Sequence, residues 1–355
     1  MNILFTVLNW GLGHAVRSIP IIAHLQKQGH QITIASDGMV IDFLKKEFPD
    51  LSFASLPAYN IQYKFKFMPF NILAKGPKIL SVLFQEHQQV QKIIRDEQID
   101  LLINDNRLAC YSKRVPSIFI THQLDVPAPN PMLRAWTNRW HHFFINKHDR
   151  CWIPDVEGTN NLAGDISRSK LKTPPLDYIG PLSTIKIDPN KADLPLLVVL
   201  SGPEPQRTYL EEKIVKQSVH LPIQTILVRG TNQAHDYHNH NIPAHLSILD
   251  LVDRKTLAAL IERAQTMICR SGYTSLLDFS LNPKRLYFIP TPGQWEQEYL
   301  AEHWKSQMGI PFTTQKDFDL KKAYEDAKKL QLEMNQQRFE SIIDQVINDI
   351  KHPAI

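Results

Sequence analysis

The first forty residues constrain the fold of this chain more than any other segment. Residues 3–8 form an apolar run, and a glycine-rich loop over residues 11–14 follows it at once. Apolar residues at helical spacing come next until Gly29 stops the pattern, and a second apolar run then ends at Ser36 and Asp37. A strand, a glycine loop, a helix and a second strand in this order predict a parallel βαβ unit.

Strand and helix patterns keep alternating along the rest of the chain. Residues 79–94 carry apolar residues at helical spacing, residues 99–103 read as the next buried strand, and the second half repeats this alternation. A proline-rich stretch breaks the pattern between the halves. Because 355 residues exceed what one hydrophobic core usually organises, we expect an α/β protein of two domains, over 1–178 and 195–335, with a linker over 179–194.

The C-terminal segment, residues 336–355, predicts a helix with one apolar face. Phe339, Ile343 and Ile347 fall on that face. An apolar helix face needs an apolar partner surface, so we expect this helix to pack back on the first domain.

Composition excludes several classes of protein. With 43% hydrophobic and 21% charged residues, the chain has the balance of an ordinary globular protein. The N-terminal apolar run lacks the features of a secretion signal and stops short of a membrane span, which predicts a cytoplasmic protein. Cys110, Cys151 and Cys269 are too far apart for a zinc site or a disulfide framework. A net charge of +4, scattered along the chain, does not favour nucleic-acid binding.

The segment 269–278, directly after a predicted buried strand, suits a nucleotide ligand. Gly272 allows close approach of the backbone, and the N-terminus of the following helix offers unpaired N–H groups to a diphosphate. Arg270 adds a positive charge, and Asp278 could accept hydrogen bonds from ribose hydroxyls. The alternative is an ordinary strand-to-helix turn with Ser275 near its start.

Residues 294–299, about twenty residues further on, gather amide and carboxylate groups after another predicted strand. Such planar polar groups bind sugars. A solvated loop that enters a helix is the alternative interpretation of the same residues.

These motifs together resemble a known family. Arg270-Ser271-Gly272 with Ser275 and Asp278, followed by Gln297-Glu298-Tyr299, is similar to the donor-site signature of the glycosyltransferases that include the bacterial enzyme adding N-acetylglucosamine to lipid I. The loop at 11–14 resembles the N-terminal glycine loop of that family. The resemblance implies the GT-B architecture, two facing Rossmann-like domains with a cleft between them. It also implies transfer from a UDP-sugar with inversion, without a metal or another cofactor.

The resemblance also implies roles for individual residues. Arg270 and Ser275 would address the donor diphosphate, Asp278 would hold the ribose, and the backbone near Leu251 would contact uracil. An aspartate replaces the usual glutamate at 278, and the second glycine loop of the family is reduced to one glycine here. The implied donor-binding residues are Ser201, Gly202, Arg207, Leu251, Arg270, Ser271, Gly272, Ser275, Asp278, Glu296, Gln297 and Glu298.

His14 is the candidate catalytic residue. A histidine with a pKa of about 6.5 can remove the proton of an acceptor hydroxyl at neutral pH. Hydrogen bonding to a phosphate beside Gly11 and Gly13, or capping of the helix, are the alternative roles. Asp105 and His122 follow two further predicted strands, where ligands of open α/β sheets collect. Together with Gly11 and Gly13, they are the candidates for acceptor binding.

Aromatic and basic residues alternate over residues 63–70, with Lys75 and Lys78 nearby, which suits an anionic lipid surface. Trp136 and Trp140, with neighbouring arginines, extend this pattern. The sequence thus predicts a peripheral association with the inner face of the plasma membrane and a lipid-linked or cell-envelope acceptor. The alternative is a loop whose aromatic side chains fold inward.

Three other functions remain open. A UDP-sugar 2-epimerase would share this architecture and donor site, and a catalytically silent protein could bind the same ligand. A dinucleotide-dependent oxidoreductase would use the glycine loop with Asp37, but Val16 stands where its fingerprint requires a third glycine. Four histidines between His235 and His245 lie in a polar segment without the spacing of a zinc site.

Overall fold

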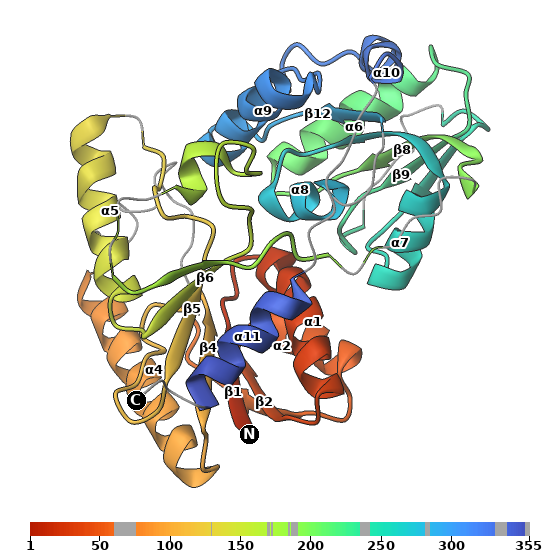
Figure 1. Ribbon diagram of the computed structural model, residues 1–355. Helices are drawn as coiled ribbons and strands as arrows, with labels where there is room; N and C mark the ends of the chain where they lie inside the picture. The colour runs from red at the N-terminus through yellow and green to blue at the C-terminus, as the bar shows by residue number, and fades with distance from the viewer. Residues whose placement is uncertain are drawn as a thin grey trace. The chain divides into compact units, whose positions relative to one another are not determined.

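The computed structural model describes residues 1–59, 76–128, 130–168, 171, 173–183, 185, 191–234, 242–280, 285–330 and 339–351. The chain divides into two compact units (Figure 1), one of Met1–Thr184 with Gln337–Ile355 and the other of Ile185–Gln336. Within the described ranges, we find no helix with both the length and the apolar character needed to cross a bilayer. The aromatic and basic segment at 63–70, with Lys75, lies outside the described residues.

The first unit is built on a parallel sheet of seven strands in the order β3-β2-β1-β4-β5-β6-β7. Its strands are β1 (Asn2–Val7), β2 (Gln31–Ser36), β3 (Ser52–Ser55), β4 (Leu101–Asp105), β5 (Ser117–Ile120), β6 (Arg150–Ile153) and β7 (Leu176–Tyr178). Its helices are α1 (Leu12–Lys27), α2 (Gly38–Glu47), α4 (Gly76–Asp96), α5 (Pro131–Ile145), η1 (Gly164–Ser167) and α11 (Glu340–Lys351). All five residues of β4 are buried, as expected for a central strand of a parallel sheet.

Helices cover this sheet through apolar side chains that alternate along the strands. Leu4 and Leu102 project to one face, where they pack with Val90, Ile93 and Ile94 of α4. At the other end of the sheet, Ile145 of α5 packs against Phe119 and Cys151. The predicted alternation of strands and helices is therefore confirmed in this half of the chain.

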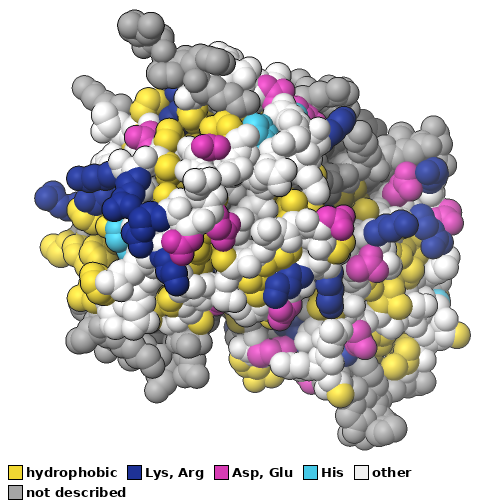
Figure 2. All heavy atoms as spheres, turned by 90° about the horizontal axis from the view of Figure 1, so that it is seen from below, with side chains coloured by type: hydrophobic (Ala, Val, Ile, Leu, Met, Phe, Trp, Pro, Cys, Tyr) yellow, Lys and Arg dark blue, Asp and Glu magenta, His cyan; other side chains and the backbone are white. Residues whose placement is uncertain are grey.

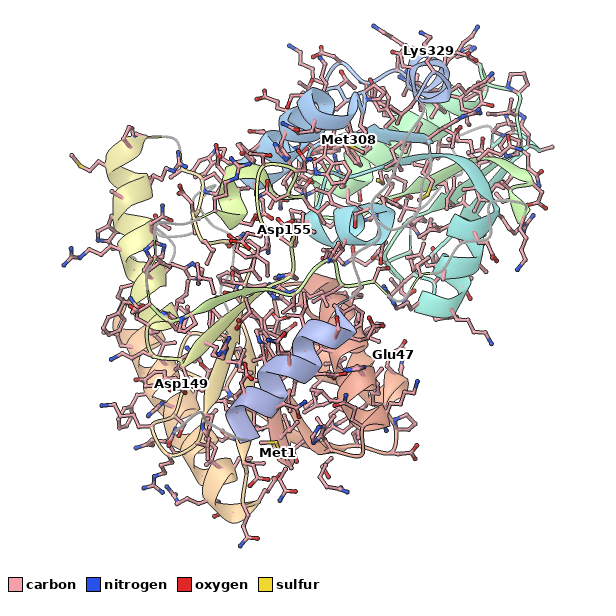
Figure 3. The ribbon with its side chains drawn as sticks, in the orientation of Figure 1. Met1, Glu47, Asp149, Asp155, Met308 and Lys329 are labelled. Carbon is pink, nitrogen blue, oxygen red and sulfur yellow. The ribbon has the colours of Figure 1, made fainter. Side chains whose placement is uncertain are left out.

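Carboxylates fix both ends of β6, and Figure 3 labels them. Asp149 precedes the strand and accepts hydrogen bonds from the backbone N–H and the hydroxyl of Ser117. Asp155 follows it, fully buried, and accepts from the N–H groups of Leu162 and Ala163 and from the hydroxyl of Ser167. These contacts hold the segment after β6 against the sheet although it contains little regular structure.

The C-terminal helix α11 belongs to the first unit, although it follows the second unit in the chain. It lies beside α1 (Figure 1), where the imidazole Nε2 of His24 is 2.6 Å from a carboxylate oxygen of Asp344 and packs edge-on against Phe339. Ile343, Val346 and Ile347 are buried. The apolar face of this helix is therefore covered within the first unit.

The second unit contains a parallel sheet of five strands in the order β10-β9-β8-β11-β12. Its strands are β8 (Leu194–Val199), β9 (Thr225–Val228), β10 (Leu246–Leu249), β11 (Ala264–Cys269) and β12 (Arg285–Phe288). Its helices are α6 (Gln206–Ser218), α7 (Arg254–Arg263), α8 (Tyr273–Ser280), α9 (Trp295–Met308) and α10 (Leu320–Lys328). One apolar core joins β8 and β11 to α6 and α10.

Substitution of Ile343 tests how much α11 contributes to the first unit. Ile343→Ala removes a fully buried side chain, so we expect the free energy of unfolding to fall by about 2–5 kcal/mol in chemical denaturation. Gln345→Ala, at an exposed position of the same helix, is the control and should change it by less than about 0.5 kcal/mol. Equal effects of the two variants would mean that α11 contributes no packing energy.

Candidate active site

Both sheets contain a point where the strand order reverses. In the first unit it lies between β1 and β4, and in the second between β8 and β11. Ligands of open parallel sheets bind beyond the carboxyl ends of the strands at such a point. The loop at 11–14 follows β1 and Asp105 ends β4, whereas Ser201 follows β8 and Arg270 follows β11. The predicted motifs thus occupy the switch points of their own sheets.

A histidine and an aspartate meet at the switch point of the first unit. Gly11, with a φ of 85° that favours glycine, precedes the first turn of α1, which carries His14. The imidazole Nδ1 of His14 lies 2.8 Å from Oδ1 of Asp105. Nη2 of Arg17 lies 2.9 Å from the same nitrogen. A proton on Nδ1 would be donated to the carboxylate and would leave Nε2 as the basic nitrogen. The His14 side chain is 15% exposed, and that of Asp105 is fully buried.

Three side chains from one face of α1 surround the Asp105 carboxylate. Besides His14, the guanidinium of Arg17 donates to both carboxylate oxygens, with Nε 2.8 Å from Oδ2. The hydroxyl of Ser18 donates to Oδ2 at 2.9 Å. Asp105, which the sequence predicts to bind the acceptor, is fully buried and accepts these bonds from the protein, so that its carboxylate contacts His14 directly. The sequence did not lead us to Arg17 and Ser18. They follow His14 by three and four residues, a spacing that places them on the same side of the helix.

Electrostatics keep His14 neutral at neutral pH. Burial lowers the pKa of His14, Arg17 lowers it further, and Asp105 opposes both. Burial alone would raise the pKa of Asp105, but Arg17 and His14 hold it well below its usual range. The pair therefore consists of an ionised carboxylate and a neutral imidazole.

His122 joins the same cluster from the segment after β5. Its Nδ1 lies 3.1 Å from Nη1 of Arg17, and its side chain is buried. His122, a candidate acceptor-binding residue, thus contacts Nη1 of Arg17, whereas Nε and Nη2 contact Asp105. Gly13 is half-buried in the first turn of α1, and Gly11, which precedes that turn, is exposed.

A second buried network occupies the carboxyl ends of β1, β2 and β4. The Arg107 guanidinium contacts Glu86 at 2.5 Å and Asp37 at 2.6 Å. Asn9 donates to the other oxygen of Asp37 at 2.9 Å. Asp37 is the carboxylate that an oxidoreductase would need for a ribose, and here it is committed to protein partners. Arg107, the second residue after β4, is thus held inside the protein by two carboxylates.

In the second unit, the structure gives Arg270 different partners from those predicted. Its guanidinium is buried and donates to the carbonyl oxygens of Ser201 (3.4 Å), Gln206 (3.2 Å) and Ile289 (3.0 Å), and to the side chain of Gln315 (2.8 Å). These contacts tie the loops after β8, β11 and β12 together. The Arg270 guanidinium therefore connects these loops, and its contact with a donor diphosphate stays a prediction.

Two further candidate residues are paired within the protein. Arg207 is buried between Glu204 and Glu211, and Glu211 also contacts Arg229 at 2.7 Å. This network leaves the predicted phosphate role of Arg207 without support. Asp278 lies 3.2 Å from Arg254 on α7 and is buried.

The remaining donor candidates lie around the loops at the carboxyl ends of β8, β11 and β12. Ser201 and Gly202 are exposed, and a side chain at 202, where φ is 103°, would meet the Thr291 hydroxyl at 3.2 Å. Gln297 accepts a hydrogen bond from the N–H of Thr291, and Glu298 accepts one from Gly293. The other candidates are Leu251, which is exposed, Gly272, Ser275 and Glu296, which are half-buried, and Ser271, whose buried hydroxyl donates to the Gln297 carbonyl.

Among the described residues, no group of histidine, cysteine or acidic side chains could hold a metal ion. His235, His238 and His240, considered in the sequence analysis, lie outside them.

Comparison with known proteins assigns the fold. Residues 1–123 match the family model described as glycosyl transferase family 1. No curated protein sequence matches the chain. Among solved structures, the glycotransferase of kitacinnamycin has a TM-score of 0.66 at 14% identity, over 99% of this chain and 95% of its own. MurG of Acinetobacter baumannii gives 0.58 at 12% identity, over 98% and 99%. Glycosyltransferase VinC in complex with dTDP gives 0.59 at 15% identity, over 99% and 96%.

The chain therefore has the GT-B fold of glycosyltransferases with two Rossmann-like domains. The GT-B fold implied by the sequence motifs is confirmed along nearly the whole chain, and residues 1–123 match a glycosyltransferase family model.

Substitutions of Arg270 separate a loop-organising role from a phosphate contact. Arg270→Ala leaves several buried carbonyls without a donor, so we expect a loss of about 2–4 kcal/mol in the free energy of unfolding, together with weaker nucleotide binding in calorimetry. Arg270→Lys keeps the charge but cannot reproduce the planar set of hydrogen bonds, and should rescue neither property. Arg285→Ala, at an exposed position on β12, is the control. Recovery of binding by lysine would instead identify a direct contact of the charge with phosphate.

Proposed function

We propose that the protein is an inverting glycosyltransferase that moves a hexose or N-acetylhexosamine from a UDP-sugar to a hydroxyl acceptor. The observation that carries this proposal is the contact between His14 and the buried Asp105 at the switch point of a GT-B fold. A neutral imidazole, oriented by an ionised carboxylate, is what a general base for a hydroxyl group requires.

The proposed reaction is a single displacement. Nε2 of His14 takes the proton of the acceptor hydroxyl while the hydroxyl oxygen attacks the anomeric carbon from the face opposite the diphosphate. The bond between the sugar and the phosphate breaks, UDP leaves, and the imidazolium later releases the proton to solvent. Attack from the opposite face inverts the anomeric centre. Asp105 stays ionised throughout and stabilises the imidazolium as it forms.

The donor groups in this proposal come from the second unit. The exposed backbone at Ser201 and Gly202 and the N-terminal turn of α8 would receive the diphosphate, because the backbone N–H groups and the dipole at a helix N-terminus favour an anion. Gln297, with Glu296 or Glu298, would contact the sugar. The assignment of uridine comes from the sequence motif, whereas VinC was solved with dTDP. A thermal-shift comparison of UDP-sugars with dTDP-sugars shows which nucleobase the protein prefers. Incubation with UDP-N-acetylglucosamine alone detects a 2-epimerase, because an epimerase would convert this sugar nucleotide without an acceptor.

His14 and Asp105 are tested by transfer from a UDP-sugar to the acceptor. His14→Ala and Asp105→Asn should each lower turnover by roughly 10²–10⁴-fold, because one removes the base and the other its orienting charge. UDP affinity should not change, since neither residue belongs to the donor unit. His220→Ala, an exposed histidine of the second unit, is the control. Full activity of His14→Ala would overturn the proposed mechanism, and retention of the anomeric configuration in the product, read by proton NMR, would overturn inversion.

We further propose that the acceptor is lipid-linked and that α5 lies against an anionic membrane surface. Met132, Trp136 and Phe143 are exposed on this helix, at 85%, 46% and 52%. Arg139 is exposed among them, and Nζ of Lys147 lies 4.5 Å from the centre of the Phe143 ring. On the side where α5 lies in Figure 1, Figure 2 shows apolar side chains bordered by Lys and Arg. Aromatic and basic side chains together suit the interface of an anionic bilayer.

Flotation with vesicles that contain anionic lipid tests this surface. The double variant Met132→Ser/Trp136→Ser should float several-fold less than the unmodified protein, because it removes apolar area that would enter the interface. Tyr209→Ala, an equally exposed aromatic position in the second unit, should float normally. If the unmodified protein does not float even at low salt, the membrane proposal fails while the transfer chemistry stands.

A further inference from the structure

We infer that Arg17 is a positioning residue that holds His14 and His122 in opposite tautomers and balances the charge of Asp105, so that His14 is presented as a neutral base. The catalytic meaning of this arrangement rests on the proposed function. The positions of the ring protons follow from the contacts alone and do not depend on that function.

The guanidinium of Arg17 is buried and reaches all three groups. Nε and Nη2 form a fork on the two oxygens of Asp105, with Nε 2.8 Å from Oδ2. Nη2 also lies 2.9 Å from Nδ1 of His14, and Nη1 lies 3.1 Å from Nδ1 of His122. One planar cation thus contacts a carboxylate and two imidazoles that come from three different elements.

These contacts define where the ring protons lie. A guanidinium only donates hydrogen bonds, so Nδ1 of His122 accepts from Arg17 and the proton of His122 sits on Nε2. Nδ1 of His14 lies 2.8 Å from Oδ1 of Asp105 and 2.9 Å from Nη2 of Arg17. Because Nη2 donates to Oδ1 and the carboxylate can only accept, we assign the Nδ1 proton to the bond with Oδ1, which leaves the lone pair on Nε2. His14 therefore offers an acceptor at Nε2, and His122 has its donor there.

The charges explain why a cation is needed at this place. With Arg17 present, the buried cluster is neutral when both imidazoles are neutral, and protonation of His14 leaves one uncompensated positive charge. Without Arg17, a neutral His14 would leave the Asp105 charge alone, and protonation of the ring would compensate it. An opposite charge within hydrogen-bond distance favours the charged form of a histidine. Arg17 removes that pull, in agreement with the lowered pKa of His14.

The consequence for transfer is a base that works at lower pH and does not retain its proton. Because the pKa of His14 in the folded protein lies below 6.5, the neutral form persists as the pH falls to that value, and activity declines only below it. After the proton has been taken from the acceptor, the imidazolium lies next to the Arg17 cation. This contact favours release of the proton and return to the neutral base.

The test is a titration of the histidine side chains by NMR in the full chain labelled with ¹⁵N-histidine, with signals assigned by comparison with His14→Gln and His122→Gln. In the unmodified protein we expect the proton of His14 on Nδ1 and that of His122 on Nε2, with His14 titrating below pH 6.5. In Arg17→Gln the pKa of His14 should rise by roughly 1–3 units, because the carboxylate is no longer balanced. The ring proton of His122 should then exchange between both nitrogens.

Two further variants keep the inference falsifiable. Arg17→Lys retains the charge, so His14 should titrate within about 0.5 unit of the unmodified protein even if Arg17→Gln does not fold. Arg150→Gln removes a comparable arginine fork, on Asp177 at 2.8 and 2.6 Å in the same unit, and should leave both histidines unchanged. An unchanged His14 pKa in folded Arg17→Gln, or the same rise in Arg17→Lys, would overturn the role of the charge.

The titration needs neither donor nor acceptor, so its outcome is independent of the proposed function. If the protein transfers sugars, the acidic limb of the transfer rate should move to higher pH in Arg17→Gln by the same number of units as the His14 pKa. A shifted pKa without transfer activity would leave the inference intact and reject the transferase.

Discussion

The first unit depends on one buried carboxylate. Asp105 ends the central strand β4 and is removed from water, where an ionised carboxylate is stable only if its oxygens are paired. Within the described part of the chain, its carboxylate accepts hydrogen bonds from His14, Arg17 and Ser18 of α1, the helix that follows the glycine loop. The same bonds therefore stabilise the charge, anchor the first turns of α1 to the sheet and orient His14. Loss of Asp105 would disturb the chemistry and the local architecture together, which is why its conservative amide variant is the informative one.

Buried arginines play a comparable role in both units. Arg107 connects α4 to the end of β2 through two carboxylates, and Arg207 lies in a network with Glu211. Arg270 is surrounded mainly by carbonyl oxygens, and burial lowers its pKa to about 10. It remains charged at neutral pH, so the loops around it are held by charge-assisted hydrogen bonds. Loops positioned in this way can present backbone N–H groups in a defined arrangement.

The fold could be predicted well from the sequence because its signals are local. Apolar runs bounded by glycine and proline predict strands, and the glycine loop at 11–14 predicts a crossover, without reference to distant residues. The candidate site was predictable only in part. Asp105 lies 91 residues from His14 in the chain, and no local pattern shows that it orients a histidine instead of facing a substrate. Likewise, the sequence pattern of a strand followed by an arginine is the same whether that arginine binds a phosphate or carbonyl oxygens. The position of Arg270 in the sequence therefore did not reveal its partners.

The return of α11 to the first unit has a consequence for how the chain is made. Residues 185–336 form a continuous unit, whereas the first unit is complete only when residues 337–355 have joined it. During synthesis the second unit can therefore finish folding while the first still lacks its last helix, and the surface that buries Ile343 and Ile347 is then still open. The unit that begins folding first is the one that finishes last, and a chain that stops before residue 339 would leave it unfinished.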